Sequence, residues 1–105
     1  MKNEPIKIIF ERSGGVAGMR TTTTVNTETL PAAEAQMLRE MVDKAKFFDL
    51  PAVLAAPKSN NADRFQYKLT VEVGNRRHTV ETGEAAAPQT LQPLLTRLGE
   101  MARRR

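Results

Sequence analysis

Cysteine and tryptophan are missing from the 105-residue chain, and histidine and tyrosine occur once each. Without cysteine there is no disulfide and no thiol nucleophile, so a reducing compartment is allowed, and we expect a cytoplasmic protein. A structural zinc site is disfavoured, because His78 is the sole histidine and no thiolate accompanies it. No apolar run reaches the ~18–20 residues that span a bilayer. The N-terminus also lacks the apolar core of a secretory signal. We therefore expect no membrane association, no metal and no cofactor.

Charge and length indicate a small basic globular chain. Sixteen Lys and Arg residues against twelve Asp and Glu residues give a net charge of +4. The length predicts one domain over residues 1–105, with 40% hydrophobic residues for one core. The terminal run Arg103–Arg105 has two interpretations: a solvated helix end, where cations complement the dipole, or a nucleic-acid contact.

Two segments near the N-terminus show the alternation of strands. Residues 5–12 alternate in part: Ile6, Ile8 and Phe10 share one face, and Lys7 and Glu11 lie opposite. In residues 19–26, four consecutive threonines disfavour a helix, because β-branched side chains are restricted at χ1 there and pack well on a sheet. The pattern predicts a hairpin closed by the stretch SGGVAG.

A helix is predicted next. Apolar residues recur at helical spacing over residues 31–47, and Pro51 prevents continuation. On this helix Arg39, Glu40, Asp43 and Lys44 are expected to face water. Residues 51–63 follow as the longest predicted loop.

The second half repeats the order of elements. Residues 64–73 alternate most clearly, Gly74 and Asn75 give a two-residue hairpin signal, and residues 76–82 return as a strand. A last helix is predicted over residues 88–103, with Pro93 starting its regular part after a looser turn.

This order, β-β-α-β-β-α, predicts an α+β fold: a four-stranded, mostly antiparallel sheet with both helices on one face. The other face is polar enough to meet water. Following the strand directions, the glycine loop, the 51–63 loop and the loop before the last helix fall at one end of the sheet. Loops on a rigid scaffold commonly bind partners.

Catalytic chemistry is disfavoured by the spacing of the polar residues. Gly14, Gly15 and Gly18 do not form G-x-G-x-x-G, and a threonine strand follows them instead of a helix N-terminus. Ser13 lacks the G-x-S-x-G elbow, and His78 is expected to be a partly buried structural residue. The carboxylates show no spacing for acid–base work. We predict that the chain is not an enzyme.

Two loops leave alternatives open. The glycines supply positive φ and a close backbone approach in a wide turn, which touches either the long loop or a partner. In the stretch PAVLAAP, Val53 and Leu54 either fold back onto the core or lie on an exposed segment. An exposed segment stiffened by Pro51 and Pro57 could enter a protease cleft at reduced entropic cost.

Three stretches carry a resemblance to a known family. IIFERSGGVAGMR, FFDLP and ADRFQYKLTVE, in this order and spacing, are similar to the emfourin family. The most specific parts are the SGG-x-AG loop and the FQY-x-LTVE strand. The family's named member inhibits protealysin, a thermolysin-like zinc metallopeptidase. The resemblance implies a small bacterial inhibitor that binds such a peptidase directly.

The resemblance also suggests where the peptidase binds. Thermolysin-like enzymes favour a bulky aliphatic side chain after the scissile bond, which Val16, Met19, Val53 or Leu54 could provide. We expect non-covalent inhibition, in which loops at one end of the sheet occlude the cleft. The expected protease-binding residues are Ser13, Gly14, Gly15, Val16, Ala17, Gly18, Met19, Val53, Leu54, Ala55, Ala56 and Lys58.

A second class of function is a non-catalytic accessory module, which could bind nucleic acid. Such binding would need basic residues interleaved with exposed aromatic side chains. Aromatic residues are 5% of the chain and are all predicted in or near the core. Nucleic acid is therefore the disfavoured partner. The five aromatic residues are Phe10, Phe47, Phe48, Phe65 and Tyr67.

Overall fold

A computed structural model describes residues 5–14, 19–54, 65–83 and 87–103. Within them, no helix is both long and apolar enough to cross a bilayer. Two short 3₁₀ turns, η1 (Thr27–Thr29) and η2 (Phe47–Asp49), flank the first helix. In chain order the strands and helices are β1 (Ile6–Gly14), β2 (Met19–Asn26), α1 (Ala32–Ala45), β3 (Val53–Leu54), β4 (Phe65–Val73), β5 (Arg76–Gly83) and α2 (Gln92–Arg103).

The sheet has five strands in the order β2-β1-β4-β5-β3. The prediction of four mostly antiparallel strands is wrong in one respect: β3 is a fifth strand, and it runs parallel to β5. Only two residues form β3, beside a backbone hydrogen bond of 2.8 Å from the Glu81 N–H to the Ala52 oxygen. So short a strand leaves no periodicity in the sequence. The other pairs are antiparallel, as predicted.

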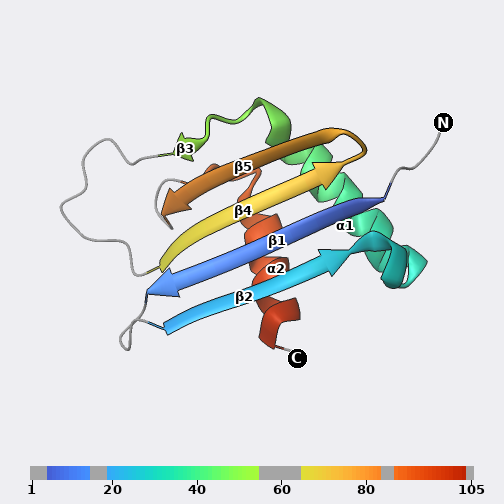
Figure 1. The fold of residues 1–105 in the computed structure, drawn as a ribbon, viewed down its shortest axis with the longest axis horizontal. Coiled ribbons are helices and arrows are strands. Elements are labelled where there is room, and N and C mark those ends of the chain that lie inside the picture. Colours follow the sequence, from blue (N-terminus) through green and yellow to red (C-terminus); the bar gives the residue numbers. More distant parts are fainter. Residues whose placement is uncertain (1–4, 15–18, 55–64, 84–86, 104–105) are drawn as a thin grey trace.

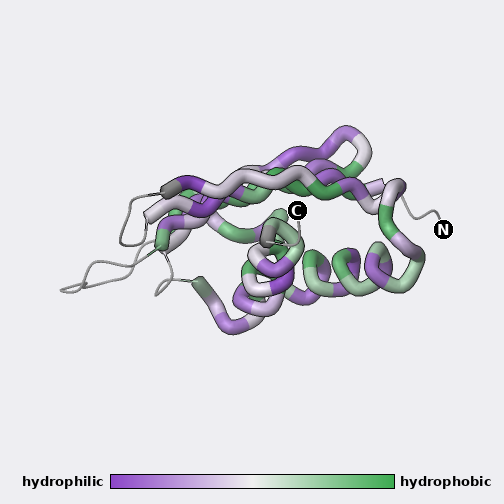
Figure 2. Tube along the Cα trace, turned by 90° about the horizontal axis from the view of Figure 1, so that it is seen from below, coloured by the Kyte–Doolittle hydropathy of each residue, from purple (hydrophilic) through white to green (hydrophobic). Residues whose placement is uncertain are grey.

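Both helices cover the same face of the sheet, which confirms the predicted layers. Figure 1 shows α1 crossing behind the sheet from the side of β2 toward β5. In Figure 2 the sheet forms one layer and the helices the other. The core between these layers is apolar. Its largest fully buried side chains are Phe10, Phe47, Ile8, Leu38, Leu69, Leu91, Leu94, Leu98, Val71 and Val80.

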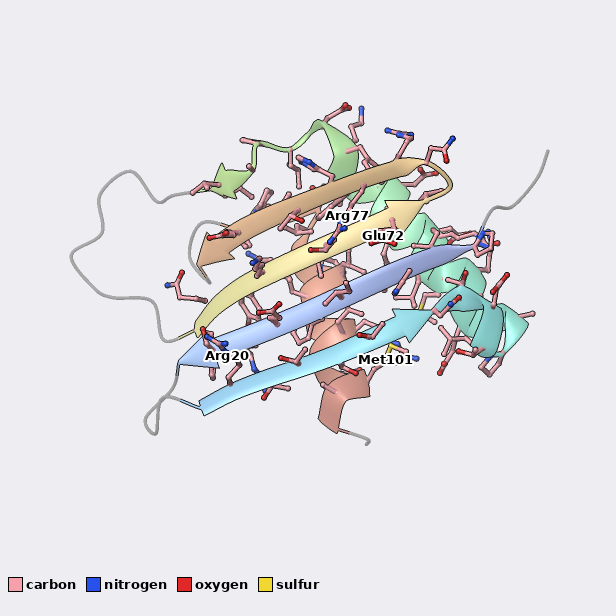
Figure 3. All side chains as sticks on the ribbon, in the orientation of Figure 1. Arg20, Glu72, Arg77 and Met101 are labelled. Carbon is pink, nitrogen blue, oxygen red and sulfur yellow. The ribbon has the colours of Figure 1, made fainter. Side chains whose placement is uncertain are left out.

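The opposite face, here called the open face, is polar, as the alternation predicted. Charged and hydroxyl side chains lie in rows across the strands. Arg77 contacts Glu72 at 3.5 Å, and the hydroxyl groups of Thr70 and Thr79 lie 2.9 Å apart. Figure 3 shows the Arg77–Glu72 pair on this face. Ile9 is an apolar residue on this face and is half-buried.

Helix α1 ends two residues before its predicted end. Lys46 adopts the left-handed conformation, with φ of 51°, and its N–H caps the helix by donating to the Asp43 oxygen at 3.0 Å. The turn that follows carries Phe47 back into the core, where 1% of it is exposed. One predicted surface residue differs: Arg39 is half-buried rather than facing water.

Helix α2 begins at Gln92, next to Pro93, where the regular part of the helix was predicted to start, and the residues from 88 onward form the looser turn that was expected before it. A turn precedes it, in which the Leu91 N–H donates to the Pro88 oxygen at 2.9 Å. Arg97 then ties the two helices together through Glu34 of α1, at 3.2 Å. The predicted apolar face of α2 is buried at its leucines.

Candidate functional site

The strand ends that carry the predicted binding loops lie together at one end of the sheet, here called the loop end. Gly14, the last residue of β1, is opposite both Met19 of β2 and Phe65 of β4. Gly83 at the end of β5 is beside Gln66 of β4. Because β3 runs parallel to β5, its last residue also reaches this end. The shared end was predicted from strand directions alone, and the register confirms it (Figure 1).

The predicted site residues do not form one compact pocket. Ser13 and Gly14 lie on β1, whereas Val53 and Leu54 lie on the edge strand β3. At the ~4.8 Å spacing of neighbouring strands, β1 and β3 are about 14 Å apart, with β4 and β5 between them. A partner that contacts both sides must therefore cover the width of the sheet end.

The structure places five of the predicted site residues: Ser13 and Gly14 in β1, Met19 in β2, and Val53 and Leu54 in β3. The others lie outside the described residues. They are Gly15, Val16, Ala17, Gly18, Ala55, Ala56 and Lys58.

In strand β3, Val53 and Leu54 lie on opposite faces of the sheet, although the sequence analysis treated them together. Successive strand residues point to opposite faces of a sheet. Val53, opposite the exposed Glu81, is 62% exposed on the open face. Leu54, opposite the buried Thr82, packs against the core. The sequence left both alternatives open for this pair, and each residue follows a different one: Val53 is exposed, and Leu54 packs against the core.

The first glycine of the loop has a backbone that requires glycine. Gly14 has φ of 114° while pairing with strands on both sides. A side chain on Cβ is strained at this φ, because the region is accessible to glycine almost alone. The backbone at the end of β1 is therefore fixed by the neighbouring strands and by the glycine together.

We expect Gly14→Ala to lower the free energy of unfolding by roughly 1–3 kcal/mol, the usual cost of a side chain in a disfavoured backbone region. Urea unfolding followed by circular dichroism measures it. Ser13→Ala is the matched control, next in sequence and half-exposed, and should change the free energy by less than about 0.5 kcal/mol. Equal stability of both variants would show that Gly14 relaxes to an ordinary conformation.

A cation–aromatic cluster that the sequence analysis missed supports the loop end. The guanidinium carbon of Arg12 lies 5.0 Å from the centre of the Phe65 ring, and Phe65 contacts Tyr67 with ring centres 6.5 Å apart. Helix α2 approaches the same arginine at Gly99, where a Cβ in place of the glycine hydrogen would lie 3.4 Å from Arg12 Nη1. The signal was the arginine on the otherwise apolar face of β1. This cluster connects β1, β4 and α2 directly behind the loop end.

His78 has the structural role that the sequence predicted. Its Nε2 lies 2.7 Å from the Leu50 oxygen, and because a carbonyl only accepts, the imidazole donates through Nε2. Its ring packs against Phe47 and Phe48, with centres 5.6 and 6.2 Å away. Within the described residues, no group of three histidine, cysteine or acidic side chains is placed to hold a metal ion.

The burial of the aromatic side chains decides whether they could stack on the bases of a nucleic acid. Phe10 and Phe47 are buried, and Phe48, Phe65 and Tyr67 are half-buried and pack against one another, the core or an arginine. On the described part of the open face there is no aromatic side chain on which a base could stack. The described part of the open face therefore lacks the stacking platform that single-stranded nucleic acids use.

Comparison with known proteins gives one result. The model of the Emfourin family matches residues 10–99, which is most of the chain. Neither the curated proteins nor the solved structures compared with the chain gave a match.

Proposed function

Since the chain belongs to the emfourin family, a family of metallopeptidase inhibitors, we propose that it inhibits a zinc metallopeptidase. The proposed target is a thermolysin-like enzyme of the protealysin type. Binding is non-covalent and uses the loop end of the sheet, which lies over the active-site cleft. The inhibitor acts in the cytoplasm and as one domain. The observation that carries the proposal is the family match over residues 10–99.

The geometry of the loop end supports this mode of binding. Five strand ends side by side are about 19 Å wide at the usual strand spacing, and three loops leave or enter the sheet there. A stable complex buries about 800 Å² on each partner, so both the glycine loop and the β3 side would contribute. A rigid sheet behind the loops reduces the entropy lost on binding.

Val53 is the apolar contact that the structure offers. Large hydrophobic side chains that are exposed among the described residues are Val53 and Met37. Met37 lies on α1, away from the strand ends, whereas Val53 lies beside the loop end. A thermolysin-like enzyme favours a bulky aliphatic side chain, and Val53 is already exposed for such a contact in the folded protein.

The test is a titration of the protein against a panel of thermolysin-like zinc metallopeptidases with a fluorogenic peptide substrate. We expect stoichiometric loss of activity at micromolar protein for at least one enzyme. Activity should return on dilution, and both chains should keep their mass, because the inhibition is non-covalent. A serine peptidase serves as the control and should keep full activity. No loss at micromolar excess across the panel would contradict the proposal.

A further inference from the structure

Strand β2 is a long edge of the sheet, and no described strand pairs with its outer side. Its eight residues pair with β1 in an unbroken register, from Asn26 opposite Lys7 to Met19 opposite Gly14, so there is no bulge. Proteins usually protect such edges with proline, charge, bulges or very short strands. The opposite edge follows that rule, since β3 has two residues and follows Pro51. In β2 there is no proline, and Arg20 is the one charged residue.

Hydrogen bonds at two places show which backbone groups of β2 point outward. In antiparallel pairs, successive residues direct their N–H and C=O groups to opposite sides. The Ile6 N–H donates to the Thr27 hydroxyl at 2.9 Å, so even-numbered residues of β1 face β2. A second hydrogen bond gives the same result. The Glu81 N–H donates to the Ala52 oxygen, so odd-numbered residues of β5 face β3. Following the alternating backbone directions from β5 through β4 to β1 again makes the even-numbered residues of β1 face β2.

The odd-numbered residues of β2 therefore bond to β1, and the even-numbered ones present their backbone groups to the outside. The outward groups belong to Arg20, Thr22 and Thr24, whose side chains are exposed on the open face. These groups are spaced as a ladder that another extended chain can complete.

A groove with apolar and polar lining residues runs along the same edge. It holds about 260 Å³. Its apolar lining residues are Val25 of β2, Leu30 after η1 and Met101 of α2, and its polar ones are Thr23, Thr24, Asn26, Thr29 and Glu34. Figure 3 shows Met101 beside β2. The volume is below that of the usual small-molecule pocket, ~300–1,000 Å³, and suits one or two side chains of a neighbouring strand.

We infer that β2 receives an extended segment of the bound metallopeptidase as a sixth strand of the sheet; this rests on the proposed function. Residues of that segment alternate in chemistry. Those on the open face lie beside Arg20 and the threonines and are acidic or polar, and those on the other face are aliphatic and enter the groove. Because β2 begins at Met19, at the loop end itself, a peptidase seated there reaches the edge without a gap.

Charge favours this occupant over a second copy of the chain. Pairing two copies through β2 would bring together two chains that each carry a net charge of +4. An acidic side chain opposite Arg20 instead meets opposite charge near the loop end, whereas Glu34 at the groove disfavours an acidic side chain there. The peptidase segment therefore gains electrostatic attraction where a self-dimer would be repelled.

Amide hydrogen exchange tests the inference. It is measured on the labelled protein alone and in complex with a peptidase that the titration shows to be inhibited. The outward amides of Arg20, Thr22 and Thr24 should exchange rapidly in the free protein and at least about tenfold more slowly in the complex. The inward amides of Thr21 and Thr23 should be slow in both states. This alternation separates strand pairing from simple coverage of the surface, which would slow exchange without a two-residue period.

A backbone variant gives an independent result. Thr22→Pro removes an outward N–H and leaves the β1 ladder intact, because edge strands tolerate proline where the N–H faces away. Inhibition should weaken about tenfold or more, whereas Thr22→Val, which keeps the N–H, should inhibit as the unaltered protein does. If Thr22→Pro does not fold, the exchange pattern decides.

The outcomes are distinguishable. Full inhibition without the alternating protection, or with Thr22→Pro as potent as the unaltered protein, overturns this inference and leaves the proposed function standing. Protection of the outward amides in the free protein, together with a dimer in sedimentation, assigns the edge to a second copy and overturns it as well. Absence of inhibition by the unaltered protein overturns the proposed function, and the inference with it.

Discussion

Replacing Phe47 with alanine is expected to lower the free energy of unfolding by about 3–5 kcal/mol, the usual cost of removing a fully buried aromatic ring. Only 1% of Phe47 is exposed, and its ring makes edge contacts with Phe48 and His78. The ring fills the space between α1, η2 and β5, so its removal leaves a cavity. A domain of this size is stable by about 5–15 kcal/mol, so the variant loses a large share of its stability.

Urea unfolding at neutral pH measures the effect, and Met37→Ala is the control. Met37 lies on the outer side of α1 with 36% exposure, and its truncation should cost less than about 1 kcal/mol. A loss below about 1 kcal/mol for Phe47→Ala would mean that the surrounding elements close over the missing ring. The core under η2 would then be more deformable than the close packing around Phe47 implies.

The position of Phe47 illustrates which features the sequence predicts and which it does not. The apolar spacing over residues 31–47 was enough to predict α1 and its buried face, with Leu38, Val42 and Ala45. The end of the helix was not predictable, because it depends on a left-handed Lys46, and lysine carries no local preference for that conformation. Phe47 and Phe48, which pack in or against the core directly after Lys46, are contacts that form only in the folded chain.

The sheet shows the same division between local and distant information. Strands β4 and β5 were predictable, since their alternation and the Gly74-Asn75 turn are local signals. Strand β3 was not, because its two residues are ordered by pairing with β5, about thirty positions away in sequence. The strand order also has no local signal, so the sequence could not show that β2 lies at an edge.

For the candidate site, the sequence predicted which end of the sheet carries the loops, but not which face of the sheet each side chain of β3 points to. The directions of the strands placed the stems of the loops together, and the register confirms this. Which of Val53 and Leu54 faces outward depends on the partner strand, because a shift of one residue exchanges the two faces. The pairing of Leu54 with Thr82 settles that choice.

The faces of β3 lead to a paired prediction on inhibition and stability. Val53→Asp should weaken inhibition of the peptidase at least about tenfold, or ~1.4 kcal/mol, because a charge replaces the exposed aliphatic contact. Its free energy of unfolding should change by less than about 0.5 kcal/mol, since Val53 is 62% exposed. Val53→Thr keeps the shape of the side chain and should weaken inhibition by a smaller factor.

Leu54→Asp should show the opposite order of effects. The carboxylate would lie against the core beside the buried Thr82, at a cost of roughly 1–3 kcal/mol in unfolding free energy. Its inhibition should recover to near the unaltered level once the folded fraction is taken into account, because Leu54 packs against the core. Inhibition constants and urea unfolding of the same preparations measure both quantities. If Leu54→Asp keeps its stability and loses inhibition while Val53→Asp inhibits normally, the peptidase contacts the core face of β3. The peptidase would then reach the part of Leu54 that stays exposed in the folded protein.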